Sequence, residues 1–183
     1  MRRPSTIAVL LLAWAWVTAA TEFTGVDQQR LGPELLITPQ FDIQLSDKVT
    51  QAIQSGIVIT FVMQVQLKQS VDWWLDRQID HKIQTMQVRY FSLSSQYQLH
   101  NRNTNTKQSF ANLNGLLAHM GGATTFSFQA EPAADYLQTR LFLDKQALPS
   151  IMQLPNVFDP DWNLNTDWQV HPLNLTTDPE TSP

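Results

Sequence analysis

The segment IVITFVMQVQLKQ, residues 57–69, decides the fold of this 183-residue chain. Its odd positions from Ile57 to Leu67 are all apolar, which is the period-two pattern of a β-strand with one buried face. Its even positions are apolar only in the first half, at Val58 and Val62, and are polar from Gln64 onward. The pattern predicts the longest strand of the domain, covered on both faces at one end and solvated on one face at the other.

Short elements of both kinds are predicted around this strand. Alternating apolar residues predict further strands over 41–46, 85–100, 124–129, 139–146 and 162–173. Capping residues and helical spacing predict short helices over 46–56 and 109–122, the second capped by Ser109 and stopped by Gly121 and Gly122. Three prolines predict irregular structure over 148–162.

Long helices do not alternate with the strands, so the sheet is predicted to be largely antiparallel. We expect an α+β fold of five to seven strands with two or three short helices, and a β-sandwich is the alternative.

The first residues have the organisation of an export signal. A basic start (Arg2 and Arg3) precedes an apolar run of 11 residues that ends in small residues at Ala19 and Ala20. That run is shorter than the roughly 20 residues needed to span a bilayer, so we expect a signal peptide over 1–20 and a periplasmic protein. An uncleaved inner-membrane anchor is the alternative. A linker (21–34), a single domain (35–171) and a disordered tail (172–183) follow.

Composition excludes several classes of function. The net charge is −4 and Lys and Arg are not clustered, which disfavours nucleic acid as a partner. Cysteine is absent, so disulfides, thiolate metal sites and a Cys nucleophile are excluded. Charged residues make up only 15% of the chain, while glutamine occurs 20 times, which indicates an amide-rich surface. We identify no motif for a cofactor or a bound metal.

The segment VDWWLDRQIDHK, residues 71–82, resembles a catalytic or metal-binding site more than any other part of the sequence. On a helix, Asp72, Asp76 and Asp80 would share one face and could hold a hard cation. In a strand they would lie along a solvated face, each about 13 Å from the next, which is too far for one metal ion. The strand continues the surrounding pattern and is therefore preferred.

Tryptophan provides the candidate contact site. In the strand interpretation, Trp73 falls on the apolar face, and alternation likewise places Trp162 and Trp168 in the core. Trp74 falls on the polar face, where a large ring supplies contact area for a partner or a sugar. The candidate contact residues are therefore Trp74, Asp76 and Gln78.

Two further candidates for acid–base catalysis have less support from the sequence. An enzyme would require Asp76, Asp80 and His81 to converge, which the strand interpretation does not predict. Asp144 follows a predicted strand, where a catalytic acid can lie, although a turn or cap role is favoured there.

The order of several motifs resembles a known but uncharacterised family. These are LSDKVTQAIQSGIVITF, DWWLDR, RYFSLSSQYQLH, SFANLNGLLAHM, TRLFLDKQALPSIMQL and DWNLNTDW. Together they are similar to an exported proteobacterial family catalogued as domain of unknown function number 4390, over about residues 35–171. The resemblance implies an exported protein without known activity and an envelope partner such as a membrane sensor histidine kinase.

We therefore expect a non-enzymatic exported domain that binds another envelope protein or assists envelope sensing. The alternative is a carbohydrate- or peptidoglycan-binding module that uses Trp74 and neighbouring amides.

Overall fold

The computed structural model describes residues 21–73, 75–157 and 159–173, without the side chains of 154–157. The expected signal peptide, residues 174–183 of the expected tail, and Trp74 lie outside the described residues. No helix in the described part of the chain is long and apolar enough to cross a membrane.

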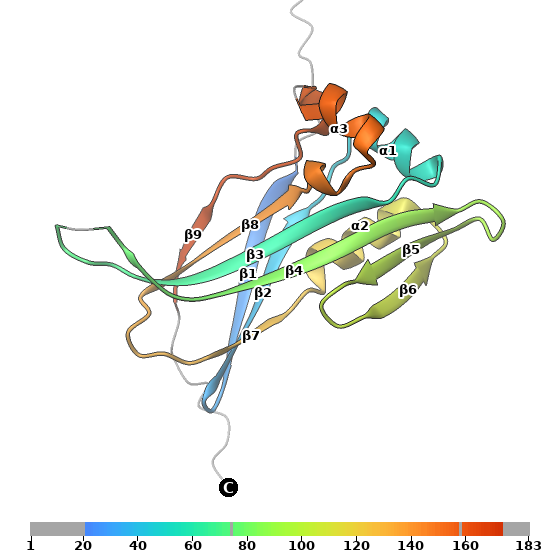
Figure 1. The fold of residues 1–183 in the computed structure, drawn as a ribbon. Helices are drawn as coiled ribbons and strands as arrows, with labels where there is room; N and C mark the ends of the chain where they lie inside the picture. The colour runs from blue at the N-terminus through green and yellow to red at the C-terminus, as the bar shows by residue number, and fades with distance from the viewer. Residues whose placement is uncertain (1–20, 74, 158, 174–183) are drawn as a thin grey trace, which may run out of the picture.

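A six-stranded antiparallel sheet forms the front layer in Figure 1. Its strand order is β6-β5-β4-β3-β8-β9. The strands are β3 (Ile59–Gln69), β4 (Arg77–Phe91), β5 (Gln96–Asn101), β6 (Thr106–Phe110), β8 (Tyr136–Leu143) and β9 (Gln169–Pro172). The strand predicted over 57–69 is confirmed as β3, which lies between β4 and β8, but it is not the longest strand: β4 has 15 residues and β3 has 11.

A three-stranded antiparallel sheet crosses behind the first (Figure 1). It consists of β1 (Glu22–Leu31), β2 (Glu34–Asp42) and β7 (Phe126–Gln129), in the order β1-β2-β7. Strand β1 lies where the sequence predicted a linker. A register shift between Phe23 and Gly25 breaks the alternation of β1, and this leaves no period-two signal to recognise.

Three short α-helices complete the part of the domain that the structure describes. They are α1 (Asp47–Gln54), α2 (Leu113–Gly122) and α3 (Ser150–Val157), with 3₁₀ turns η1 (Lys145–Ala147) and η2 (Pro160–Trp162). The prediction of α1 is confirmed: Ser46 caps it by accepting from the Val49 amide, and Val49, Ala52 and Ile53 are buried. The irregular structure predicted over 148–162 is wrong for α3, which includes Pro155.

Helix α2 begins later than predicted and packs closely on β2. Its N-cap is Asn112, whose side chain accepts from the Gly115 amide at 2.7 Å, while Ser109 belongs to β6. Gly121 lies within the helix, and a Cβ there would be 2.2 Å from the Phe41 carbonyl oxygen. The glycine therefore allows the helix to approach the backbone of β2.

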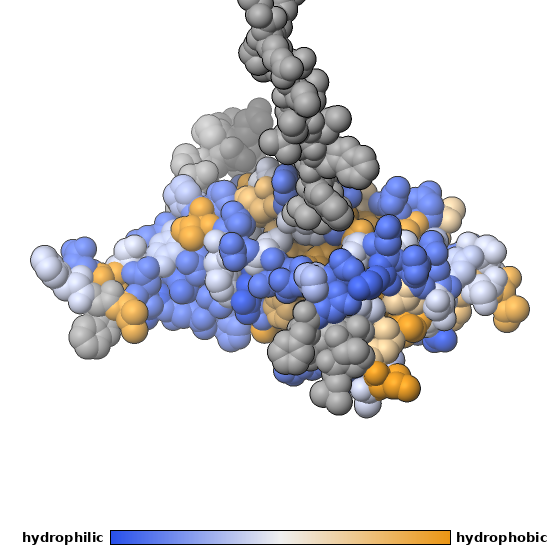
Figure 2. All heavy atoms as spheres, turned by 90° about the horizontal axis from the view of Figure 1, so that it is seen from above, coloured by the Kyte–Doolittle hydropathy of each residue, from blue (hydrophilic) through white to orange (hydrophobic). Residues whose placement is uncertain are grey.

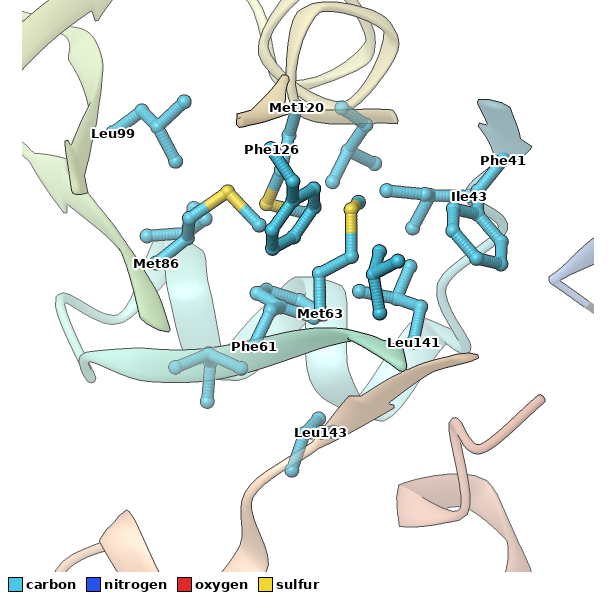
Figure 3. Close-up of a cluster of buried hydrophobic side chains, with 14 of the residues drawn as sticks. Phe41, Ile43, Phe61, Met63, Met86, Leu99, Met120, Phe126, Leu141 and Leu143 are labelled. Carbon is cyan, nitrogen blue, oxygen red and sulfur yellow. The ribbon is translucent and has the colours of Figure 1, made fainter. Parts of the chain in front are cut away.

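The core lies between the two sheets and α2. Figure 3 shows Met63, Met86 and Met120 arranged around the ring of Phe126, so that β3, β4, α2 and β7 meet at one point. Unbranched methionine side chains adapt to the irregular space between crossing sheets.

Side chains of β4 cover the outer edge of β7. Lys82 donates to the Ser127 carbonyl, and the Gln84 amide donates to the Thr125 carbonyl at 3.2 Å. The Lys82 ammonium also lies 5.2 Å from the centre of the Phe128 ring. The two sheets are thus joined by polar contacts along one seam as well as by the core.

The α+β class is confirmed, with two antiparallel sheets and three α-helices. The described residues form nine strands rather than the five to seven predicted. The predicted closing strand over 162–173 is shorter: β9 begins only at Gln169, after an isolated bridge between Phe142 and Asn165.

Candidate functional site

The connection between β3 and β4 is the most distinctive surface element of the described structure. Residues 70–76 join the two strands and project beyond the rest of the sheet, at the left of Figure 1. Trp73 has φ +67°, a left-handed conformation that bulky residues rarely adopt. The strand predicted over 71–82 therefore begins only at Arg77, because the chain reverses in the preceding residues.

Three apolar side chains are exposed on this connection, which we call the hairpin tip (residues 70–76). The exposed fraction is 38% for Val71, 101% for Trp73 and 83% for Leu75. In Figure 2 the surface is mostly hydrophilic, and apolar atoms appear at the left end, where this hairpin projects. Apolar residues exposed singly are normal, but three within five positions call for an explanation.

Two hydrogen bonds to the start of β8 hold the base of the hairpin tip. The Tyr136 hydroxyl donates to the Asp76 carboxylate, and the Ser70 amide donates to Asp135 Oδ2 at 2.8 Å. The Asp135 amide in turn donates to the Lys68 carbonyl at 2.8 Å. Both ends of the exposed segment are thus fixed to the six-stranded sheet.

Burial, the hydrogen bond to the negatively charged Asp76 and the nearby Asp135 together raise the pKa of Tyr136 to about 12, with burial the largest cause. The phenol therefore remains protonated across the physiological range and is a permanent donor to Asp76. The contact between the hairpin tip and β8 does not switch with pH near neutrality.

The predicted site residues have different neighbours in the structure. Trp74 lies outside the described residues. The carboxylate of Asp76 is bound by Tyr136, and the Gln78 amide lies 3.3 Å from His81 Nδ1. Asp80 accepts from the His81 backbone amide at 2.7 Å. Asp76 thus anchors the tip, and the structure does not bring it together with Asp80 and His81.

No group of three or more His, Cys, Asp or Glu residues that could hold a metal ion occurs among the described residues. Asp144 accepts from the Gln146 amide at 3.0 Å and caps η1, which agrees with the turn role favoured from the sequence.

The tryptophans differ from prediction in one important respect. Trp162 is buried as predicted, and Trp168 is partly buried with the Arg140 guanidinium 4.3 Å from its ring centre. Trp73 was predicted to lie in the core and is instead fully exposed. Alternation assigns a side chain to a face only while the chain stays in a strand, and the turn at Trp73 ends that assignment.

Comparison with known proteins adds one finding. A family model described as Domain of unknown function (DUF4390) matches residues 19–171. No curated protein and no solved structure matches the chain.

Proposed function

The chain belongs to the family of the Domain of unknown function (DUF4390), and from this premise we propose that it is an exported, non-enzymatic domain that binds an envelope protein through its hairpin tip. The extracytoplasmic part of a membrane sensor histidine kinase is the partner we propose. Residues 71–75 are the contact surface.

The observation that carries the proposal is Trp73. Its side chain is fully exposed, so it contributes no burial to the fold. Its φ of +67° costs a non-glycine residue about 1–2 kcal/mol. Glycine or asparagine would suit this turn better. A tryptophan at a position where folding favours a small residue supports a role in recognition, in which tryptophan is among the commonest hot-spot residues.

The anchoring of the tip supports the same role. The contacts of Asp76 with Tyr136 and of Ser70 with Asp135 fix both ends of the exposed segment before any partner arrives. A preorganised loop loses less conformational entropy on binding than a flexible one. Val71 and Leu75 flank Trp73 and enlarge the apolar contact.

Charge around the tip indicates the chemistry of the partner. Asp72, Asp76 and Asp135 are exposed close to the apolar side chains, with Arg77 as the adjacent cation. A complementary protein surface has an apolar pocket with Lys or Arg at its rim. The same acidic residues disfavour adsorption to anionic lipid, and we therefore favour a protein partner over a membrane surface.

Photo-crosslinking tests the proposal in the native envelope. A benzoylphenylalanine at Leu75 is expected to crosslink to the sensor kinase, and one at Leu93 is not. Leu93 is a matched control because it is fully exposed between β4 and β5, away from the hairpin tip. The purified extracytoplasmic kinase domain should then bind the wild-type chain, and Trp73→Gly should lose about 30-fold in affinity, the equivalent of a 2 kcal/mol hot spot.

Equal crosslinking at Leu75 and Leu93, or binding of the kinase domain unaffected by Trp73→Gly, would reject the tip as the contact surface. Export is tested separately by fusing residues 1–40 to a reporter that is active only outside the cytoplasm. An inactive reporter would reject the periplasmic location.

The alternative function, carbohydrate or peptidoglycan binding, is favoured by the same exposed ring, because aromatic faces present a flat apolar surface to a ligand. Sedimentation with purified cell wall distinguishes it: retention lost in Trp73→Gly or Trp74→Ala supports this alternative, and absence of retention rejects it.

A further inference from the structure

A polar hollow of about 370 Å³ lies between α2 and the inner face of strands β4, β5 and β6. It is separate from the hairpin tip, because along β4 it begins at Gln84, seven positions beyond the first residue of the strand, or roughly 23 Å. Its polar lining includes Gln84, Asn101, Thr104, Thr106, Gln108 and His119.

Along this face of the sheet, the residues change from apolar to polar at the hollow. Val88, Leu99 and Tyr97 on the same face pack into or against the core. Two positions before Val88 along β4, this face carries Met86. The next inward residue is Gln84, whose side-chain amide donates to the Thr125 carbonyl just before β7. Gln84 and Asn101 are half-buried, whereas Thr104, Thr106 and Gln108 are exposed, so the hollow is open to solvent on the side of β6.

Hydrogen bonds within the lining hold its groups in place. The Asn101 amide donates to Gln84 Oε1 at 2.6 Å, and Asn101 Oδ1 accepts from the backbone amides of Asn103 and Thr104 at 3.0 and 3.2 Å. The hydroxyls of Thr104 and Thr106 lie 2.8 Å apart. The wall formed by β5 and the following turn is therefore preorganised rather than loosely solvated.

Two side chains on opposite sides keep hydrogen-bonding capacity for a ligand. Gln108 comes from β6 and His119 from α2, and neither makes a side-chain hydrogen bond to another described residue. The His119 ring packs 5.3 Å from the centre of Phe110, which orients it. The apolar part of the lining is provided by Met86 and Leu99, which lie side by side at the margin of the core in Figure 3.

We propose that this hollow binds a neutral saccharide of one or two rings. Its lining contains no carboxylate, Lys or Arg among the described residues, so it offers an ionic ligand no carboxylate, ammonium or guanidinium partner. Amides and hydroxyls both donate and accept, as sugar hydroxyls require, and the apolar lining suits the C–H face of a ring. The volume lies at the lower end of the range of about 300–1,000 Å³ found for small-molecule sites.

Amide-resolved NMR titration of the domain with cellobiose and with N,N′-diacetylchitobiose tests this inference. Shifts are expected at Thr104, Thr106 and Gln108, with binding about fivefold to tenfold weaker in Gln108→Ala and in His119→Ala. Gln98→Ala is the matched control: it changes the same residue type on the opposite face of the neighbouring strand β5, and should leave binding unchanged.

The inference would be overturned if neither disaccharide caused shifts at about 20 mM. That concentration is well above the ~1 mM dissociation constant of a weak site. Equal weakening by Gln98→Ala would also overturn it. Shifts confined to residues 70–76 would reject the hollow and support carbohydrate binding at the hairpin tip instead, so the two sites are tested independently.

Discussion

Replacement of Gly121 by alanine is expected to destabilise the domain, although alanine is the better helix former. In an exposed helix interior the change would gain about 1 kcal/mol. Here the new Cβ would lie 2.2 Å from the Phe41 carbonyl oxygen and 3.3 Å from its carbon. Both are backbone atoms of a paired strand, so α2 must move away by about 1 Å to restore ordinary contact distances.

That movement would loosen the packing of Leu116 and Met120, which are fully buried on the same helix. Overpacking of this kind typically costs about 1–3 kcal/mol, occasionally more. We expect a net loss of about 2 kcal/mol, which lowers the melting temperature by roughly 4–8 °C for a domain of this size.

The assay is thermal and urea unfolding of the domain followed by circular dichroism, with Gly122→Ala as the control. Nothing lies within 4 Å of a Cβ at Gly122, the next residue of the same helix. The control should be neutral or stabilised by up to about 0.5 kcal/mol. If Gly121→Ala were as stable as Gly122→Ala, the close approach of α2 to β2 would be refuted.

Three other substitutions test single features of the structure. Thr60→Val should raise the free energy of unfolding by about 1 kcal/mol, because the Thr60 hydroxyl is buried without a partner among the described residues; a lower melting temperature would contradict this. The pKa of Tyr136 is raised to about 12 in the folded state, so folding favours the neutral phenol. The neutral phenol therefore contributes its full stabilisation of the fold below pH 10, and this contribution is lost between pH 10 and 12. Tyr136→Phe should therefore show a shallower fall in melting temperature over that interval than the wild type, and parallel curves would refute the contact. Trp73→Gly should change the free energy of unfolding by less than about 1 kcal/mol, because relief of the left-handed strain offsets the flexibility of glycine; a large loss in urea unfolding would show that Trp73 has a structural role.

Period-two alternation predicted part of the two sheets. It missed most of β2, although Leu35, Ile37 and Phe41 alternate and are buried there, because the strand predicted over 41–46 overlaps only the last two residues of β2. It identified β3, β7 and β8, and capping residues with helical spacing identified α1, because the buried residues of each element recur at the period of that element. It failed for β1, whose bulge and polar side chains remove the signal.

The contact role of Trp74, Asp76 and Gln78 stays a prediction, but the face assigned to the neighbouring Trp73 was wrong. Alternation assigned Trp73 to the core and Trp74 to the surface, and the structure shows Trp73 fully exposed. A local pattern cannot locate the point at which a long hairpin turns. The anchoring role of Asp76 was also beyond prediction, since Tyr136 comes 60 positions later in the sequence. Likewise Gly121 reads as a helix stop until the neighbouring strand is known.

The position of β3 between β4 and β8 also determines the order in which the chain can assemble. Strand β4 follows β3 directly, so this hairpin can form as soon as both are available. The other side of β3 stays unpaired until β8 arrives, and Thr139, whose hydroxyl donates to the Gln64 carbonyl, lies 75 positions after that residue. Contacts between such distant segments form slowly. In the interval, a strand whose first five residues are all buried in the folded domain exposes a free edge that can recruit other chains. Aggregation during folding is therefore expected to begin at β3, and fragments that end before residue 136 should be the least soluble form of this protein.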